Sequence, residues 1–334
     1  MGKEFAIGHT LRGQLGHYTL TRRLEECVWT AINNHKQNVI IKSVRHWRLQ
    51  NERDILRHLQ HQTPFLRPII DEIVEPNDPP GIVLRWLDED VWAASNKQQL
   101  TRREVKFVAK GVLESLKTLH ENGYVHTDIK PKNVLINYGT GNNRIKEVQL
   151  ADLGGSLPLD SKFLKEGEEM GTEVFRSPEA QLQLGLGPPM DIWAFGATVI
   201  GLLYGDNFHI FAPTVPRSDP QYHLHLLIEH HRIFGPWPDS YEDICDEERL
   251  NVLAYTMDIS PSETLRPFSH TSTAELDEKD RDFICRIMKL DPRDRPTAEQ
   301  LLNDEWLEDV VPQYEAVEML DSSWQVHVPI AIPA

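Results

Sequence analysis

Three polar side chains of different chemistry lie close together in the segment His126–Leu135, which reads HTDIKPKNVL. Asp128 can accept a proton from a hydroxyl group, and Lys130 can neutralise a phosphoryl oxygen. Asn133 can offer its amide oxygen to a hard cation such as Mg²⁺. Phosphoryl transfer needs these three roles, because its catalysis depends on positioning and charge neutralisation. The segment therefore predicts the centre of a phosphoryl-transfer site.

A second segment downstream supplies another carboxylate. Val148–Gly154 (VQLADLG) is predicted to be a strand that ends in Asp-Leu-Gly. In this order the two segments resemble the H-R-D-L-x-x-x-N and D-F-G motifs of protein kinases. The resemblance implies that Asp128 and Lys130 are catalytic, and that Asn133 and Asp152 hold Mg²⁺ on the phosphates of ATP. A few hard oxygen ligands also suit Mg²⁺ better than zinc.

The first part of the chain resembles the small lobe of a protein kinase. Alternating and β-branched residues predict strands at residues 18–24, 28–31 and 38–44, and apolar spacing predicts a helix over residues 45–59. In this resemblance Lys42, on the third strand, binds the α- and β-phosphates of ATP. Glu52, on the helix, is the expected ion-pair partner of Lys42.

The adenine pocket is also expected from the resemblance. Residues 82–87 (IVLRWL) are predicted to form a buried strand that leads into the connector between the lobes. Ile40 stands where kinases usually carry alanine, and its larger side chain narrows the space for the nucleotide. The expected nucleotide contacts are Val28 as roof, Ile40, Leu84 as gatekeeper, Trp86 and Leu87 beside the adenine, Asp90 near the ribose and Leu135 as floor.

The phosphate-covering loop departs from the kinase pattern. Kinases read G-x-G-x-x-G-x-V there, so that backbone amides approach the phosphates without an intervening Cβ. Here the corresponding segment, Leu24–Val28 (LEECV), has no glycine and places two glutamates where a triphosphate would be repelled. Gly13 and Gly16 offer another register. We favour the first register and interpret Gly13 and Gly16 as lead-in turns.

Further motifs follow in the kinase order. A capped helix is predicted over residues 101–121, DIWAFG at 191–196 resembles the start of a central helix, and Arg295 is the expected buried partner of Glu179. Arg176 and the long segment after Phe234 resemble the group of cyclin-dependent, MAP, Clk and SR-protein kinases. The run ADLGG and this segment also resemble fungal members.

Two threonines bear on specificity and regulation. Thr172 stands where serine/threonine kinases carry a threonine that hydrogen-bonds the catalytic aspartate and lysine, which favours Ser/Thr specificity. Thr127 replaces the arginine that in many kinases binds an activation-loop phosphate. Since threonine cannot do this, we expect activity without loop phosphorylation.

Composition limits the classes of partner. The chain has 334 residues, a net charge of −16 and 40% apolar residues. Without a long basic run, we expect neither nucleic acid nor a membrane as partner, although a basic protein substrate is compatible with this charge. Three dispersed cysteines and no signal-peptide pattern favour an intracellular location, in the cytoplasm or the nucleus. We also expect a monomer. The longest apolar run, residues 192–204, is shorter than the ~20 residues of a membrane span.

The expected architecture is an α+β, bilobal, protein kinase-like fold. We predict a lead-in at residues 1–17, a small β-rich N-lobe at 18–87, a larger helical C-lobe at 88–306 and a tail at 307–334. The expected function is Mg-ATP-dependent transfer of the γ-phosphate to a protein Ser/Thr hydroxyl. A pseudokinase scaffold is the alternative, because the glycine loop is missing. A small-molecule kinase is disfavoured by the intact activation segment.

Overall fold

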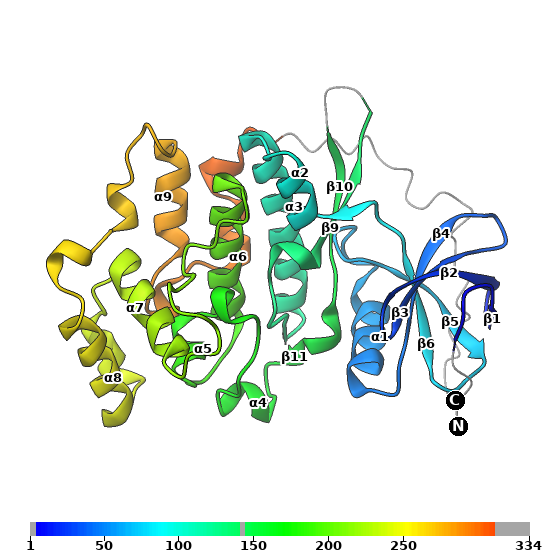
Figure 1. Ribbon diagram of the computed structural model, residues 1–334, viewed down its shortest axis with the longest axis horizontal. Coiled ribbons are helices and arrows are strands. Elements are labelled where there is room, and N and C mark those ends of the chain that lie inside the picture. The colour runs from blue at the N-terminus through cyan, green and yellow to red at the C-terminus, as the bar shows by residue number, and fades with distance from the viewer. Residues whose placement is uncertain (1–4, 141–143, 311–334) are drawn as a thin grey trace.

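The computed structural model describes residues 5–140 and 144–310 as a β-rich lobe joined to a larger helical lobe (Figure 1). The strands are β1 (Thr10–Gly13), β2 (His17–Glu25), β3 (Val28–Ile32), β4 (Asn38–Ser43), β5 (Ile69–Glu75), β6 (Gly81–Arg85), β7 (Glu89–Asp90), β8 (Tyr124–Val125), β9 (Val134–Tyr138), β10 (Ile145–Leu150) and β11 (Leu157–Pro158). The α-helices are α1 (Trp47–Leu59), α2 (Val91–Lys97), α3 (Arg102–Glu121), α4 (Lys162–Lys165), α5 (Pro178–Gln181), α6 (Pro188–Tyr204), α7 (Tyr222–Phe234), α8 (Glu247–Asp258), α9 (Glu278–Ile287) and α10 (Ala298–Leu302). The expected bilobal α+β fold is confirmed.

The small lobe is a closed barrel with the strand order β1-β2-β3-β4-β6-β5. Alternating apolar residues of these strands fill its interior, because successive side chains of a strand point to opposite faces. The buried interior includes Leu20, Ala31, Ile41 and Val83. Helix α1 packs outside the barrel, beside the strands (Figure 1), and this places Glu52 next to β4.

Strand β1 and strand β5 were not expected from the sequence. Strand β1 pairs with both β2 and β5 and so closes the barrel. The turn after β1 is fixed by the buried carboxylate of Asp71, which accepts hydrogen bonds from the backbone nitrogens of Gln14 and Leu15 and from the hydroxyl of Tyr18. Gly13 is required there, because a Cβ would lie 2.2 Å from Asp71 Oδ2. The expected lead-in therefore contains a strand of the barrel.

The hairpin between β2 and β3 has the register that the sequence favoured. Glu25 pairs with Val28, so that Glu26 and Cys27 form a tight turn at its tip. Val28 pairs in turn with Lys42 on β4. The glycine-free segment is thus the loop above the cleft.

Helices α3 and α6 form the centre of the larger lobe. Helix α3 begins at a capping box in which Thr101 and Glu104 each bond the backbone of the other, as the predicted cap requires. The apolar run that the sequence showed lies in α6, most of which is buried. The expected ion pair is also present: Arg295 donates to both carboxylate oxygens of Glu179 at 2.7 and 2.8 Å. In the described ranges, no helix is long and apolar enough to cross a membrane.

Short strands between the lobes position the polar segments. Strands β10, β9 and β7 form one small sheet, and β11 pairs with β8 in another. The segment with Asp128 connects β8 to β9, while the Asp-Leu-Gly segment follows β10 and leads to β11. Since β9 and β10 are antiparallel partners, the start of β9 and the end of β10 bring Asn133 and Asp152 to the same edge.

Candidate active site

The segment that carries Asp128 is anchored by a buried aspartate from α6. Asp191 accepts hydrogen bonds from the backbone nitrogens of His126 and Thr127 at 2.7 and 2.9 Å. The imidazole of the fully buried His126 also lies 3.1 Å from the carbonyl oxygen of Ala151. This confirms the expected bracing by Asp191, and it ties the loop to the segment that carries Asp152.

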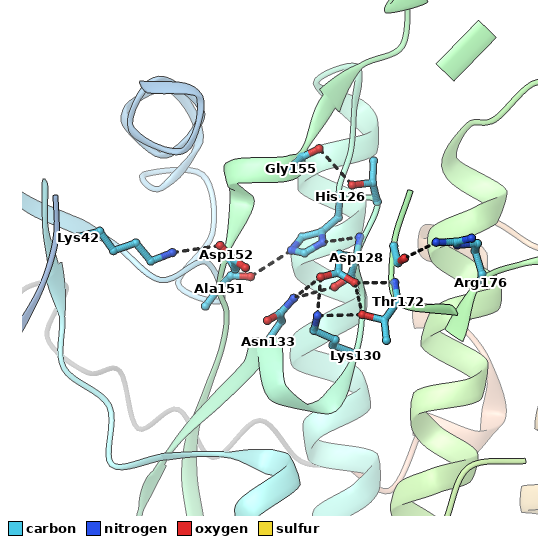
Figure 2. A network of polar contacts seen from close by, with 12 residues as sticks. Lys42, His126, Asp128, Lys130, Asn133, Ala151, Asp152, Gly155, Thr172 and Arg176 are labelled. Carbon is cyan, nitrogen blue, oxygen red and sulfur yellow. Dashed lines mark hydrogen bonds and ion pairs between the residues drawn. The ribbon is translucent and has the colours of Figure 1, made fainter. Parts of the chain in front are cut away.

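Both carboxylate oxygens of Asp128 accept hydrogen bonds (Figure 2). Lys130 Nζ lies 2.6 Å from Oδ2, while the hydroxyl and backbone nitrogen of Thr172 lie 2.9 and 3.0 Å from Oδ1. Lys130 also donates to the Thr172 hydroxyl at 2.9 Å. The contacts expected between Thr172, Asp128 and Lys130 are therefore confirmed. They hold the carboxylate in one orientation at the cleft.

The Lys42 ammonium group connects two carboxylates, those of Glu52 and Asp152, and Figure 2 shows its contact with Asp152. It lies 2.9 and 3.0 Å from the oxygens of Glu52, which confirms the expected ion pair, and 3.1 Å from Asp152 Oδ1. Burial alone would lower the pKa of Lys42, but Glu52 and Asp152 outweigh it and raise that pKa. Lys42 is thus held as a cation in the cleft.

Asp152 and Asn133 offer oxygen atoms suited to a hard divalent cation. Asp152 has a left-handed backbone (φ 64°), and its side chain is 53% exposed. Burial opposes its ionisation, but Lys42 outweighs burial and lowers the pKa of Asp152, so a carboxylate is favoured. The amide nitrogen of Asn133 donates to the Asp128 carbonyl at 2.8 Å, which leaves its amide oxygen as an acceptor. Among the described residues, no three His, Cys, Asp or Glu side chains form a metal-binding group.

A cleft of about 1020 Å³ joins these groups to the expected nucleotide contacts. Leu84 differs from the rest, because it is fully buried behind the cleft and does not line it. Asp90 also caps α2, since its Oδ1 accepts from the backbone nitrogen of Ala93 at 2.9 Å. The expected residues that do line the cleft are Val28, Ile40, Lys42, Glu52, Trp86, Leu87, Asp90, Asp128, Asn133, Leu135 and Asp152.

Comparison with known sequences assigns the chain to a family. The sequence profile of the protein kinase domain matches residues 7–307. The chain belongs to the protein kinase domain family. The mitogen-activated protein kinase HOG1 of Debaryomyces hansenii is 24% identical over 81% of this chain and 67% of its own length. Cyclin-dependent kinase 8 of Drosophila melanogaster is 28% identical over 76% of this chain and 59% of its own length.

A third relative shows how much of a longer protein such a domain can represent. The serine/threonine-protein kinase shk1/pak1 of Schizosaccharomyces pombe is 24% identical over 67% of this chain, yet the match spans only 27% of that protein. The relatives bear out the resemblance to serine/threonine kinases of the cyclin-dependent and MAP kinase group. The roles of single residues remain predictions.

The hairpin above the cleft is where this kinase domain departs from its family. Glu25 lines the cleft, and neither Glu25 nor Glu26 forms an ion pair with another described residue. Instead, Arg23 donates to the backbone carbonyls of Glu25 and Glu26 at 3.2 and 2.9 Å. These bonds stabilise the turn through its backbone, and among the described residues they leave both carboxylates without an ion-pair partner.

Three polar residues of this kinase domain's cleft region were missed in the sequence. Arg67 lines the cleft, and burial lowers its pKa to about 10 in spite of nearby Glu52. Lys132, within the segment His126–Leu135, lies 5.9 Å from the ring centre of Trp92. Asn51, beside Glu52 on α1, contacts the segment after Asp152. Each resembles an ordinary surface residue locally, so only the folded chain reveals its position.

Proposed function

We propose that the chain is a Mg-ATP-dependent protein kinase that transfers the γ-phosphate to a Ser or Thr hydroxyl of a protein. One observation carries the proposal. Asp128, Lys130 and Thr172 are hydrogen-bonded to one another, and Asp128 and Thr172 line the same cleft as the ion pair of Lys42 and Glu52. A scaffold has no need for a carboxylate held at an open cleft by a lysine ammonium group and a threonine hydroxyl. Phosphoryl transfer needs this arrangement.

In this proposal Asp128 orients the acceptor hydroxyl and receives its proton as the new oxygen–phosphorus bond forms and the bond from the γ-phosphorus to the bridging oxygen breaks, with ADP as the leaving group. The side chain is 26% exposed, so a substrate can reach it, and the contacts from Thr172 restrict its rotation. Lys130 is shared between Asp128 and Thr172, from where it can neutralise charge on the transferred group. Fixed donors of this kind act without reorganisation during the reaction.

The nucleotide would lie between the lobes. Val28 and Leu135 would enclose the adenine, and Lys42, held by Glu52, would bind the phosphates. Asn133 and Asp152 would hold Mg²⁺, which neutralises phosphate charge when bound. The buried Glu52 fixes the position of the Lys42 ammonium group that would bind the phosphates, because Lys42 cannot move away without leaving a buried carboxylate unpaired.

A pseudokinase scaffold is the second candidate, and the hairpin favours it. The absence of glycine in residues 24–28 leaves Cβ atoms that hinder a close approach of the backbone amides, and Glu25 at the cleft adds negative charge where phosphates would lie. We favour activity, because the hairpin would only cover the phosphates, whereas Asp128, Asn133 and Asp152 would carry the reaction.

The proposal extends to the division of the chain and its partners. We infer an N-lobe at 18–87, joined by β1 from the lead-in, a C-lobe at 88–306 and a tail from 307, most of which lies outside the described residues. The partner would be a protein with a Ser or Thr acceptor, compatible with basic sequences. We also expect a monomer without nucleic acid or membrane as ligand.

Nucleotide binding and transfer test the two candidates separately. A thermal-shift titration with ATP, with and without Mg²⁺, followed by transfer of labelled phosphate to a mixed-sequence protein substrate, should give a Mg²⁺-dependent shift and labelled Ser or Thr. Asp128→Asn should keep the shift and lose transfer. Asp258→Asn, at an exposed position at the end of α8, is the matched control. Binding without any transfer by the unaltered chain would support the scaffold instead.

A further inference from the structure

The segment after Asp152 is held by an asparagine from α1. Asn51 Nδ2 lies 2.7 Å from the carbonyl oxygen of Ser156, 3.1 Å from that of Gly154 and 3.5 Å from that of Leu153. A carboxamide nitrogen has two hydrogens, so the two shorter contacts use both of them. Asn51 therefore joins two segments about a hundred residues apart in the sequence by its side chain alone.

The two segments that Asn51 joins also pack closely against each other. A Cβ on Gly154 would lie 3.1 Å from the backbone oxygen of Arg48, in the first turn of α1. Leu153 and Ser156 are fully buried, and the short 3-10 helix η2 (Leu153–Gly155) lies against α1. This contact fixes where the first half of α1 lies relative to Asp152.

Asn51 and Glu52 are adjacent on α1, and consecutive residues of a helix point about 100° apart. One side chain therefore contacts the segment after Asp152, while the other contacts Lys42. Rotation or outward movement of α1 would break both sets of contacts together.

We propose that Asn51 is a positioning residue that holds α1 where Glu52 pairs with Lys42, and that it does so without a phosphate on the activation segment. The proposal rests on the proposed kinase function, and it adds a contact that keeps the charged set, Lys42, Glu52 and Asp152, together. Asn51 itself touches neither nucleotide nor acceptor.

The catalytic segment contacts the same stretch from the other side. The hydroxyl of Thr127 donates to the carbonyl oxygen of Gly155 at 3.1 Å. Thr127 stands at the position where an arginine could bind a phosphate, and here it makes a neutral bond to the backbone. Residues 153–156 thus accept hydrogen bonds from Asn51 of α1 and from Thr127 of the catalytic loop. Neither contact requires a modified residue.

A kinetic test uses two carboxamides on the same helix. Asn51→Asp replaces the donor by a carboxylate of the same shape, which repels the two carbonyl oxygens. Gln50→Glu makes the same chemical change at the exposed neighbouring position. With phosphatase-treated protein, kcat should fall about 10-fold or more in Asn51→Asp, because bonds of this kind each contribute on the order of a factor of ten. The KM for the protein substrate should stay unchanged, and Gln50→Glu should match the unaltered chain.

A double-mutant cycle tests whether Asn51 acts through Glu52. In a Glu52→Gln background, Asn51→Asp should cause little further loss, because the ion pair that it positions is already gone. Losses that multiply in full would overturn the proposal, since they would mean that Asn51 stabilises the fold independently of Glu52. Equal activity of Asn51→Asp and the unaltered chain would overturn it as well.

Hydrogen exchange provides a readout that does not depend on phosphate transfer. Asn51→Ala should increase amide exchange in peptides covering α1 and residues 153–157, while Gln50→Ala should not. If the chain transfers no phosphate but shows this pattern, the proposed function fails and the positioning contact stands. Unchanged exchange in both segments would refute the contact even in an active kinase.

Discussion

Replacing Thr172 by valine removes one hydroxyl from the centre of the candidate active site. Valine has nearly the same shape, so the backbone of the activation segment should stay in place. The backbone nitrogen of Thr172 would still donate to Asp128 Oδ1 at 3.0 Å. The two lost contacts are the bond to Asp128 and the bond from Lys130, both 2.9 Å long.

The expected loss follows from the charge of the two partners. A hydrogen bond to a charged group contributes about 1.5–3 kcal/mol. The side chains of Asp128 and Lys130 are 26% and 23% exposed, so water can replace part of what is lost. A cost near the lower end, about 1.5–2 kcal/mol, corresponds to a decrease in kcat of roughly 10- to 30-fold, since each factor of ten in rate is about 1.4 kcal/mol.

Steady-state transfer of labelled phosphate to a protein substrate measures this decrease. Thr172→Ser retains the hydroxyl and should keep kcat within about three-fold of the unaltered chain, a range set by the methyl contact alone. The KM for ATP should be similar in both variants, because Thr172 is bound to Asp128 and Lys130 and not to Lys42. Full activity of Thr172→Val would refute the role of this hydroxyl, and equal losses in Ser and Val would point to packing instead.

Three further changes test other parts of the molecule. Glu179→Gln should lower the free energy of unfolding by about 3–5 kcal/mol in urea titrations, because it leaves the buried Arg295 without its carboxylate; unchanged stability would contradict the buried pair. Gly13→Ala should destabilise the barrel by about 1–3 kcal/mol, because its Cβ would displace Asp71, while leaving cleft chemistry unaltered if the barrel stays closed. Burial, followed by the charge of Arg295, lowers the pKa of His230 to about 3, below its usual 6.5. As pH falls below 6.5 the unfolded chain alone gains that proton, so unfolding at pH 5 should cost about 2 kcal/mol less than at pH 7.5, and this contribution should vanish in His230→Phe.

Much of the fold could be predicted because its elements have regular patterns. The apolar stripe and cap of α3, the apolar run of α6 and the β-branched strand β4 each give a local signal that packing does not reverse. Strand β5 was missed because its inward face is Ile69, Asp71 and Ile73, so that a buried carboxylate interrupts the apolar alternation. Strand β1 is only four residues long, and its second partner, β5, lies far along the chain.

The candidate site could be predicted to the extent that chemistry requires particular residue types at fixed spacing. Asp128, Lys130 and Asn133 are close in sequence, and their mutual contacts follow from one short loop. Asn51 gave no such signal, because a single asparagine within a helix looks like a solvated residue until its carbonyl partners are known. Leu84 was expected at the cleft as gatekeeper by its position in the resemblance, but it is fully buried and does not line the cleft.

The hairpin between β2 and β3 and the charged set of Lys42, Glu52 and Asp152 have opposite effects on nucleotide binding. In a glycine-free turn the Cβ atoms hinder a close approach of the backbone amides, so the phosphates would depend more on Lys42 and on a cation held by Asn133 and Asp152. Lys42 is well placed for this, because Glu52 is 4% exposed and cannot lose its partner without a large cost. Glu25 adds repulsion at the same place. These opposing effects predict that ATP binds this domain weakly without a divalent cation, and that Glu25→Gly strengthens binding without changing the chemistry at Asp128. Isothermal titration of both forms with and without Mg²⁺ measures this, and equal affinity in all four cases would show that neither the hairpin nor the cation controls the nucleotide.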